Sequence, residues 1–579
     1  MPVKEVRTLG WIQNSASTNS LKDVVKLFVY DSSVNKFLRE IQIPRLITAE
    51  NGRDKFIGLL SDEQKMVIPY KDLKGKGKPS GGTRKDSPCS GIIQAAIKGQ
   101  GAKEYTDDWS SDCFLRWAIS LGFLEYDRES DCCYISDFGK KFAATPDNSA
   151  QEKDLLGLAY LSYPPAVRVL SLLNQYTHMT KFEIGGKLGI MGEAGFTSVP
   201  QNLFLQGLHD AVSQTERTKI SQNVEGDSDK YARMICGWLA NIGWVKREPK
   251  TVSERLGNTE YNGIINSAFT ITLEGRTRLK QVYGSSSTKK VPKIVLWEML
   301  ATKPSDKIYL RNRRAYIIKC LNSASKSIDD VQKFLEANGF NENQTAILDD
   351  IHSLENIGLS VKNENGQYKI TDTIIKLDIP AFEKKSEKSD ISVIKDRIRE
   401  RLQNLNHKYL CLIDLSFDGA ANRDFEIQTI DLLTNELCFK GARLGESRRP
   451  DGIIHHDRNG LIIDNKAYAK GYSLPMGQQD EMARYIEENK TRDSALNPNR
   501  WWLGFPDNVM LFNFLFVSSV FTDGVNAKLL QLSRRTSTNG AAINSQNLLL
   551  LAEEIKSCRL SYKDCFELFN KNNEVCVVN

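Results

Sequence analysis

The sequence predicts a multidomain protein in which tandem α+β domains of the winged-helix type precede an α/β domain with a central mixed sheet. Three observations predict this fold class. At 579 residues, the chain is too long for one core and should hold about four domains. A helix, a glycine and two strands recur at three places. A charged segment then separates these units from an Ile- and Leu-rich C-terminal part.

The recurring unit is an amphipathic helix that ends at a glycine, followed by an apolar strand, a polar turn and a second alternating strand. Its copies lie at 109–137, 229–272 and 354–372, with glycines Gly122, Gly243 and Gly358. A helix followed by a two-stranded wing is the winged-helix form of helix-turn-helix. Helix, glycine and strand also follow one another in many other α+β domains. Three copies favour tandem winged helices.

Composition places the domain boundaries. We expect the winged-helix domains at 1–155, 156–288 and 289–378. Residues 379–390 are rich in charge and serine and poor in apolar side chains, as linkers are. A new helix then opens the last domain, 391–579, in which helical stretches alternate with short Ile- and Leu-rich strands.

The overall composition is that of an ordinary folded protein, with 40% apolar residues and a net charge of +6. A polyanionic partner would therefore be bound by local basic patches. No apolar run reaches the ~18–20 residues of a membrane span, and residues 1–20 lack the apolar core of a signal peptide. The 11 cysteines form no C-x-x-C pair, so we expect neither disulfides nor zinc clusters, and a reducing cytoplasm as the setting.

Two acids and a lysine come together in a predicted hairpin of the last domain. Asp464 and Lys466 lie on a strand at 460–468, and the period of two places both on one face. Asp451 opens the preceding strand, and 457–460 forms the turn. The Asp-x-Lys motif is weak evidence by itself. It also occurs at 72–74, where it precedes a glycine-rich loop and has no partner acid one strand earlier. The strand context distinguishes the two.

This arrangement suits metal-dependent hydrolysis of a phosphodiester. Two carboxylates can hold a hard cation such as Mg²⁺, and the backbone carbonyl of Asn465 can add an oxygen ligand. A lysine ammonium beside the metal stabilises charge in the transition state. Glu426, on a helix at 424–430, could add a further carboxylate. The alternative is a hairpin with surface charges, but the neighbouring Ile462 and Ile463 indicate a buried strand, where unpaired acids are costly.

Longer strings of residues carry a family resemblance. They are 11–14, 109–112, 115–118, 228–234, 291–293, 297–302, 447–452, 464–468, 471–475, 479–482, 484–485 and 501–502. On these strings the chain resembles the FokI-type IIS restriction endonucleases over essentially its whole length. The resemblance implies a prokaryotic, cytoplasmic, Mg²⁺-dependent nuclease of the PD-(D/E)xK type, with Asp451, Asp464 and Lys466 as catalytic residues.

The resemblance further implies that the first two domains read a short asymmetric double-stranded DNA site, of the GGATG kind, and that the third makes mainly protein contacts. Cuts would fall at a fixed distance downstream, and a cognate DNA methyltransferase is expected. The family's DNA-contacting positions fall on Gln13, Asn14, Arg84, Gln100, Trp109, Gln222, Glu225, Lys230 and Arg233.

These residue types suit base reading, since Arg and Lys bind guanine, Gln and Asn bind adenine, and Glu accepts from cytosine. Gln222 stands where the family has an asparagine. The loop between Asp451 and Asp464 is a few residues shorter than in the family. Independently of the family, Arg84 and Lys85 follow a basic loop at 71–78 that suits phosphate contact. A solvated run of charges is the alternative there.

A predicted helix at 477–489 carries Asp480 and Arg484 four residues apart, a spacing that allows an ion pair within the helix. In the family, these two positions pair across a transient dimer of nuclease domains, an arrangement suited to a two-fold axis. One nuclease domain holds one metal centre, so dimerisation accounts for cutting both strands.

Two other functions remain open from the sequence. One is a winged-helix DNA-binding protein whose nuclease domain is inactive, although the acids and the lysine are intact. The other is an RNA or structure-specific nuclease, which the base-reading residue types and the lack of RNA-binding signatures disfavour. The sequence does not show whether the nuclease domain rests against the recognition domains before DNA is bound.

Overall fold

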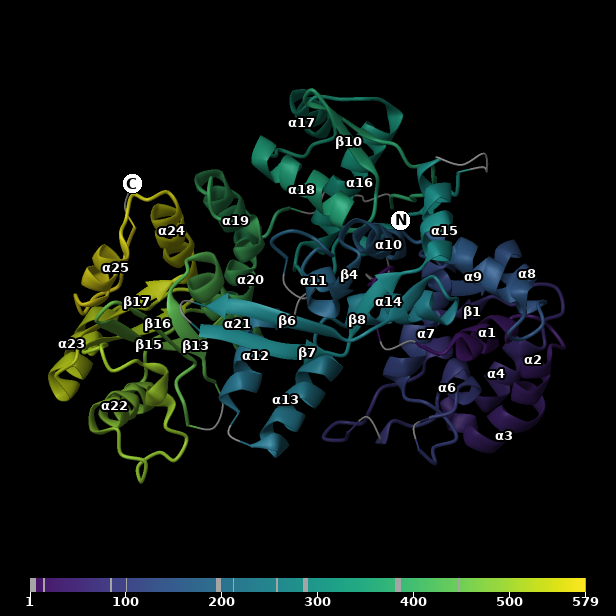
Figure 1. The fold of residues 1–579 in the computed structure, drawn as a ribbon. Helices are drawn as coiled ribbons and strands as arrows, with labels where there is room; N and C mark the ends of the chain where they lie inside the picture. The colour runs from purple at the N-terminus through teal and green to yellow at the C-terminus, as the bar shows by residue number, and fades with distance from the viewer. Residues whose placement is uncertain are drawn as a thin grey trace.

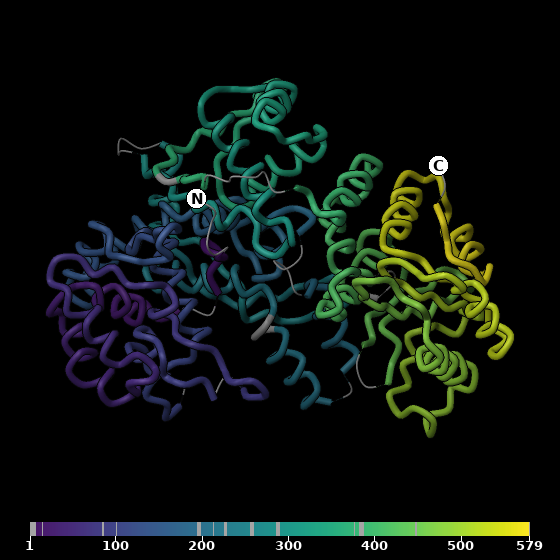
Figure 2. Tube along the Cα trace, turned by 180° about the vertical axis from the view of Figure 1, so that it is seen from behind, coloured from purple at the N-terminus to yellow at the C-terminus, as the bar shows by residue number. Residues whose placement is uncertain are grey.

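The computed structural model describes residues 7–13, 16–83, 86–99, 101–193, 199–211, 213–256, 259–284, 290–380, 387–445 and 448–577. Figure 1 shows the N-terminal units together on one side and the C-terminal domain on the other, with the third unit above them. Figure 2 shows the same arrangement from behind. In the described part of the chain no single helix is long and apolar enough to cross a membrane, and only the helices α9 (Ala150–Ser162) and α10 (Pro164–Tyr176), taken as a pair bent by 90°, pass that test.

The first unit is mostly helical and carries one small sheet, of order β1-β3-β2. Its elements are α1 (Thr18–Lys26), α2 (Ser33–Phe37), α3 (Ile43–Leu46), α4 (Arg53–Leu60), β1 (Ile68–Pro69), α5 (Tyr70–Lys74), α6 (Ile92–Ala96), α7 (Asp108–Ser120), β2 (Leu124–Asp127), β3 (Cys132–Ile135) and α8 (Asp137–Ala143). A π-helical turn η1 (Leu38–Gln42) joins α2 to α3, and a 3₁₀ turn η2 (Ala49–Asn51) precedes α4.

The second unit has a sheet of order β4-β8-β5 and a separate hairpin, β6-β7. Its elements are α9 (Ala150–Ser162), α10 (Pro164–Tyr176), β4 (His178–Thr180), α11 (Lys181–Gly185), α12 (Gln201–Asp210), α13 (Gln214–Asp227), α14 (Lys230–Asn241), β5 (Val245–Arg247), β6 (Lys250–Leu256), β7 (Thr259–Ile265), β8 (Ala268–Ile271) and α15 (Leu273–Tyr283).

The third unit packs three helices beside two short sheets, β10-β11 and β12-β9. Its elements are β9 (Lys293–Ile294), η4 (Trp297–Met299), α16 (Lys307–Ser323), α17 (Ile328–Ala337), α18 (Gln344–Asn356), β10 (Val361–Glu364), β11 (Gln367–Ile370) and β12 (Ile374–Lys376).

The predicted recurrence of helix, glycine and two strands is present in all three units. The helices α7, α14 and α18 end next to Gly122, Gly243 and Gly358, whose φ angles are 74°, 84° and 105°. Each helix is followed by an antiparallel pair of strands: β2 with β3, β5 with β8, and β10 with β11. In the second unit the hairpin β6-β7 is inserted between the paired strands, which the sequence did not predict.

The first two units share one hydrophobic core, which runs from Leu9 to Leu296. The helices α7 and α14 meet within it, where the rings of Trp117 and Trp238 stack with centroids 4.7 Å apart. The equivalent helices of two copies of the unit are therefore packed directly against each other. A second core, around Trp297, organises the third unit.

The C-terminal domain is built on a five-stranded mixed sheet of order β13-β14-β15-β16-β17. Its elements are α19 (Asp390–Arg401), η5 (His407–Leu410), α20 (Cys411–Phe417), α21 (Asn422–Asp431), η6 (Leu432–Glu436), β13 (Lys440–Arg443), β14 (Gly452–His456), β15 (Asn459–Lys466), α22 (Met476–Thr491), η7 (Trp501–Gly504), β16 (Leu511–Ser518), α23 (Val525–Thr536), β17 (Gly540–Asn544), α24 (Ser545–Lys556) and α25 (Tyr562–Phe569).

Both faces of this sheet are covered, as expected for strands that are apolar along most of their length. On one face Ile463 belongs to a core with α20, α21, α24 and α25. On the other face Ile462 packs with α22 and α23. Both isoleucines are fully buried, which confirms the buried strand that the sequence indicated.

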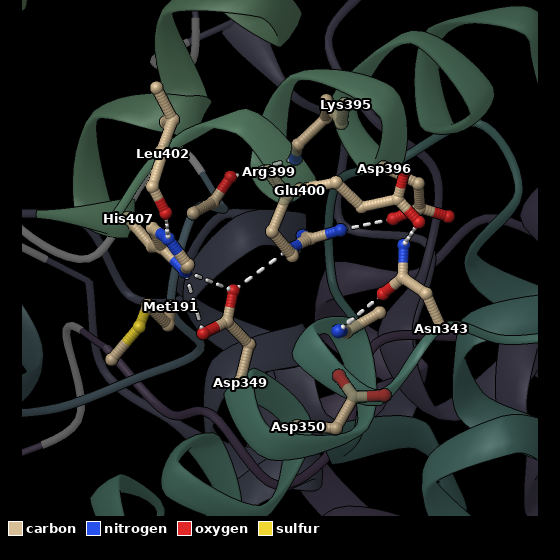
Figure 3. Close-up of polar contacts among 12 residues, drawn as sticks. Met191, Asn343, Asp349, Asp350, Lys395, Asp396, Arg399, Glu400, Leu402 and His407 are labelled. Atoms are coloured by element: carbon tan, nitrogen blue, oxygen red, sulfur yellow. Dashed lines mark hydrogen bonds and ion pairs between the residues drawn. The ribbon is translucent and has the colours of Figure 1, made fainter. Parts of the chain in front are cut away.

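The C-terminal domain is docked on the second and third units in this structure. Figure 3 shows the polar contacts where α19 and η5 face α18. The carboxylate of Asp349 accepts from Arg399 Nε at 2.7 Å and faces His407 Nδ1 at 2.9 Å. Lys395 donates to the carbonyl of Gly192 at 2.7 Å. A second contact involves α12, where Gln206 Nε2 donates to the carbonyl of Gly441 at 3.0 Å.

We expect the docking to weaken as the pH rises. Both ring nitrogens of His407 face groups that only accept, since Nε2 lies 3.1 Å from the carbonyl of Leu402. Burial and Arg399 lower the pKa of His407, but the hydrogen bond and charge of Asp349 outweigh them and raise it above 6.5. Because the pKa is raised in the docked state, the contribution of protonated His407 to docking is fully present below pH 6.5. It is lost as the pH rises through the pKa that His407 has in the docked state.

Small-angle scattering of the chain by itself should therefore show a larger radius at pH 8.5 than at pH 6. His407→Gln should remove most of this difference, because a neutral amide cannot titrate. An unchanged pH response in His407→Gln would assign the effect to other groups.

Candidate active site

The predicted acids and lysine meet at the end of the central strands. Lys466 Nζ lies 2.8 Å from Asp464 Oδ1 on the same face of β15, as the period of two required. Asp451 immediately precedes β14, and its Oδ2 accepts from the backbone N–H of Asn465 at 2.6 Å. The turn is tighter than expected: β14 ends at His456 and β15 begins at Asn459. The three side chains thus gather at one edge of the hairpin.

The electrostatics of these groups favour the binding of a cation. Burial and then the charge of Asp451 raise the pKa of Asp464. Burial also raises the pKa of Asp451. The pKa of Lys466 would fall on burial alone, but the charges of Asp464 and Asp451 raise it above 10.5. A bound cation would add to the charge of Lys466 in offsetting the repulsion between the two carboxyls and would favour their ionised forms.

Glu426 reaches this site from α21. Burial and the charge of Asp451 raise its pKa, and its Oε1 lies 2.8 Å from Arg443 Nε on β13. A Cβ at Gly445 would come within 2.3 Å of that same oxygen, so the glycine leaves room for the carboxylate. Arg443 was not singled out from the sequence, because nothing in 440–443 shows that the strand will face an acid 17 positions earlier.

The donor set fits a hard cation such as Mg²⁺. Asp451, Asp464 and Glu426 offer carboxylate oxygens, and the role of the Asn465 carbonyl stays a prediction. Within the described ranges, no group of three or more Asp, Glu, His or Cys residues is placed so that it could by itself hold a metal ion. Mg²⁺ commonly keeps several waters and is held by one or two carboxylates and substrate phosphate, which this open arrangement allows.

The second occurrence of the Asp-x-Lys spelling has a different environment. Asp72 lies within the short helix α5, and its carboxylate accepts from Lys55 Nζ. Asp72 therefore lies on a helix and not on a buried strand of a sheet. The structure thus agrees with the strand context in separating the two occurrences.

The helix α22 also borders the site, and the sequence analysis did not connect it with the metal centre. Its residues Met482, Tyr485 and Ile486 are buried. Tyr485 Oη lies 2.9 Å from the carbonyl of Arg449 and 3.0 Å from Glu481 Oε1. The i, i+4 spacing of Glu481 and Tyr485 is visible in the sequence, but their approach to Arg449 depends on tertiary packing.

The two predicted dimer residues have separate partners within this chain. Asp480 pairs with Arg535 of α23, and each side chain is 52% exposed. Arg484 Nη2 lies 3.5 Å from Glu481 Oε1, and its Nε lies 3.7 Å from Glu488. The ion pair within the helix that the spacing allowed is thus replaced by pairs with other residues.

Four of the predicted DNA-contacting residues, Gln13, Trp109, Lys230 and Arg233, lie near the first turns of α7 and α14. Trp109 is on the first turn of α7, and Lys230 and Arg233 are on the first turn of α14. Gln13 follows Trp11, whose ring meets that of Tyr231 on α14 at 5.5 Å. Because α7 and α14 pack together, these side chains belong to one region of the molecule.

The other predicted DNA contacts are less well placed by the structure. Gln222 is exposed on α13. Glu225 lies on the same helix, but its side chain is outside the described residues, as are Asn14, Arg84 and Gln100 entirely.

Comparison with known proteins covers nearly the whole chain. Family models of FokI match in four places: recognition subdomain 1 at residues 7–145, recognition subdomain 2 at 152–287, the D3 domain at 300–366 and the cleavage domain at 388–576. The type II restriction enzyme FokI of Planomicrobium okeanokoites is 40% identical over 99% of this chain and 100% of its own. StsI of Streptococcus sanguinis, also a type II restriction enzyme, is 29% identical over 94% and 92%.

Solved structures agree with this relationship. The structure of the restriction endonuclease FokI superposes with a TM-score of 0.90 at 40% identity, covering 98% of this chain and 100% of that one. FokI bound to DNA superposes with a TM-score of 0.92 at 39% identity, covering 99% and 100%. The family resemblance read from the sequence is confirmed. The chain belongs to the FokI family of type II restriction enzymes and is a site-specific deoxyribonuclease.

Proposed function

We propose that this chain is a type IIS endonuclease that binds a short asymmetric DNA site of the GGATG kind and makes Mg²⁺-dependent staggered cuts at a fixed distance downstream. The observation that carries the proposal is the meeting of Asp451, Asp464 and Lys466 at one sheet edge. This edge belongs to a domain that is separate in sequence from the recognition units. A site so placed can cut DNA that the recognition units do not touch.

In this proposal, the three N-terminal units select the DNA site. Helix, glycine and strand pair recur three times, and we take each as a winged helix within domains 1–155, 156–288 and 289–378. The first turns of α7 and α14 carry Trp109, Lys230 and Arg233, and such residue types suit contact with base edges and phosphates. The known structure of FokI bound to DNA supports DNA as the partner.

The chemistry of the cut follows from the residues of the PD-(D/E)xK-type centre at 391–579. Asp451 and Asp464, with Glu426 nearby, would hold Mg²⁺, which would supply Lewis-acid chemistry for hydrolysis of the scissile phosphodiester. Lys466 places its ammonium where negative charge develops on the phosphate oxygens. Its contact with Asp464 fixes the direction of the ammonium before the substrate arrives.

Cutting of both strands requires a second nuclease domain in this proposal, because one chain carries one such centre. Asp480 and Arg484 on α22 would pair across a two-fold axis. Both side chains are partly exposed, so their present ion pairs are screened and exchange at little cost. We further expect a prokaryotic cytoplasmic enzyme accompanied by a DNA methyltransferase that protects the same site.

Run-off sequencing of long duplex DNA treated with the chain and Mg²⁺ tests the proposal. We expect one reproducible motif at a constant offset from the cuts on each strand. DNA that is bound at a motif but remains uncut would instead support a DNA-binding protein with an inactive nuclease domain. Cuts without any common motif would contradict the assigned recognition.

A further inference from the structure

A cleft with a volume of about 330 Å³ lies between the second and third units. One wall is formed by α10 and the end of α15, and the other by residues at and around β10 (Figure 1). None of the residues that line it is among the predicted DNA contacts or the predicted catalytic residues. Its volume is in the range of sites that hold a small molecule.

Close contacts between the two units fix the walls of this cleft. Gly358 follows α18 and lies against the start of α10, where a Cβ on the glycine would come within 1.9 Å of the carbonyl oxygen of Pro164. Arg168 on α10 donates from Nη2 to Asn356 Oδ1 at the end of α18, at 2.9 Å. Both contacts cross the boundary between the units. A ligand therefore meets a cleft that is already formed, which lowers the cost of ordering on binding.

Positive charge predominates along the cleft. Its lining includes three cations, Arg168, Lys290 and Lys362, and one acid, Glu355. Lys290 Nζ donates to a neutral acceptor, the carbonyl of Thr371, at 2.6 Å. Burial lowers the pKa of Arg168, and the charge of Glu355 opposes this only in part. An anion in the cleft would be attracted by all three cations and would favour the charged form of the buried arginine.

A fourth cation lies close to this group. Lys293 on β9 is fully buried, and its Nζ has no hydrogen-bond partner among the residues that the structure describes. Burial lowers its pKa to about 7; the charge of Asp372 opposes this shift, and that of Lys290 adds to it. Asp372 accepts from the backbone N–H of Ser360, which lines the cleft, at 2.6 Å. A bound anion would thus also lower the cost of keeping Lys293 charged.

An aromatic ring lies beside these cations. Tyr283, at the end of α15, lines the cleft and is 50% exposed. Its hydroxyl is hydrogen-bonded to Ser171 Oγ on α10, which holds the ring in place. Every nucleobase has a flat face that can stack on such a ring, whatever its sequence. A half-exposed ring next to several cations therefore suits a ligand with both a base and a phosphate.

We propose that this cleft binds a nucleoside monophosphate. The phosphate lies against Arg168, Lys290 and Lys362, and charge-assisted hydrogen bonds hold it there. The base stacks on Tyr283. Duplex DNA is excluded as the occupant, because a cleft of this volume admits one nucleotide and a duplex is far wider. The ligand bridges the second and third units, so it stabilises the folded chain by mass action. The site is separate from the predicted metal centre and does not depend on the proposed function.

Isothermal titration calorimetry of the full chain tests this proposal, with AMP, inorganic phosphate and adenosine as the probes. A chelator is present throughout, so that divalent ions at the C-terminal domain do not bind the phosphate. We expect AMP to bind with a Kd of about 0.1 mM or tighter. Phosphate lacks the base and adenosine lacks the charge, so each should bind about tenfold more weakly or worse. Saturating AMP should also raise the melting temperature.

Three variants locate the bound nucleotide. Lys290→Gln and Lys362→Gln should each weaken AMP binding about fivefold or more, because each removes a charged donor. Lys362 is exposed on β10, so its replacement should leave the melting temperature without ligand unchanged. Tyr283→Leu should weaken AMP binding about tenfold and leave phosphate binding unchanged. Lys333→Gln, an exposed position on α17, makes the same change of charge away from the cleft and should bind AMP like the unchanged chain.

Two sets of results would overturn the proposal. The cleft is not the site if AMP fails to bind, or if Lys290→Gln and Lys362→Gln bind it as tightly as the unchanged chain does. The ligand is not a nucleotide if phosphate binds as tightly as AMP, or if Tyr283→Leu keeps the full affinity for AMP, because the base would then contribute nothing.

Discussion

Asp464→Asn should lower the cleavage rate by about a thousandfold or more while leaving specific DNA binding nearly unchanged. The substitution removes one carboxylate from the predicted metal site and also the contact that directs Lys466. Binding should survive because the residues placed against DNA lie on α7 and α14, in the recognition units. Gel-based cleavage assays and binding titrations on the same duplex measure the two effects.

Asp457→Asn is the matched control for this prediction. Asp457 lies in the turn of the same hairpin and is exposed, with a φ of 50° that Asn also tolerates. The chemical change is identical, so both activities should remain within about twofold of the unchanged chain, as is usual for surface substitutions. Loss of binding and cleavage together in Asp464→Asn would argue against separate recognition and cutting domains.

Asp480→Arg should reduce double-strand cutting by at least about tenfold, because like charges then oppose each other in the dimer. Within the chain, the new arginine would also face Arg535 in place of the present ion pair. A second chain with Arg484→Asp should restore much of the cutting when the two variants are mixed, since opposite charges again meet across the axis. Rates of nicking and of double-strand cutting on the same DNA measure the rescue.

This experiment also separates dimerisation from catalysis. Each variant keeps Asp451, Asp464 and Lys466, so single-strand nicking should persist in each. If the mixture cuts no better than either variant alone, α22 does not form the interface. Arg535→Ala is a useful companion, because it releases Asp480 from its present partner without changing the proposed pair.

The local part of the active site could be predicted from the sequence. The period of two places Asp464 and Lys466 on one face, and the buried Ile462 and Ile463 define the strand that carries them. Arg443, Glu481 and Tyr485 could not be predicted in this way. They arrive from another strand and from a helix, and their distances to the site depend on packing across the sheet.

The same division applies to the fold. The helix ends at Gly122, Gly243 and Gly358 depend on neighbouring residues in the sequence and could be predicted. The structure shows a positive φ at each of these glycines. The hairpin β6-β7 was missed because its residues are mostly polar and carry little apolar alternation. Docking of the C-terminal domain through Asp349 could not be predicted from the sequence either, because the residues that meet there are separated by about 50 positions or more along the chain.

The central claim is that one part of the chain chooses the site and another part cuts outside it. The most direct test maps two things on one end-labelled duplex: the segment protected by the Asp464→Asn chain and the cuts made by the unchanged chain. We predict cuts on both strands outside the recognised motif, at offsets that stay constant when the intervening sequence is changed. Cuts within the motif, or offsets that follow the intervening sequence, would contradict the account.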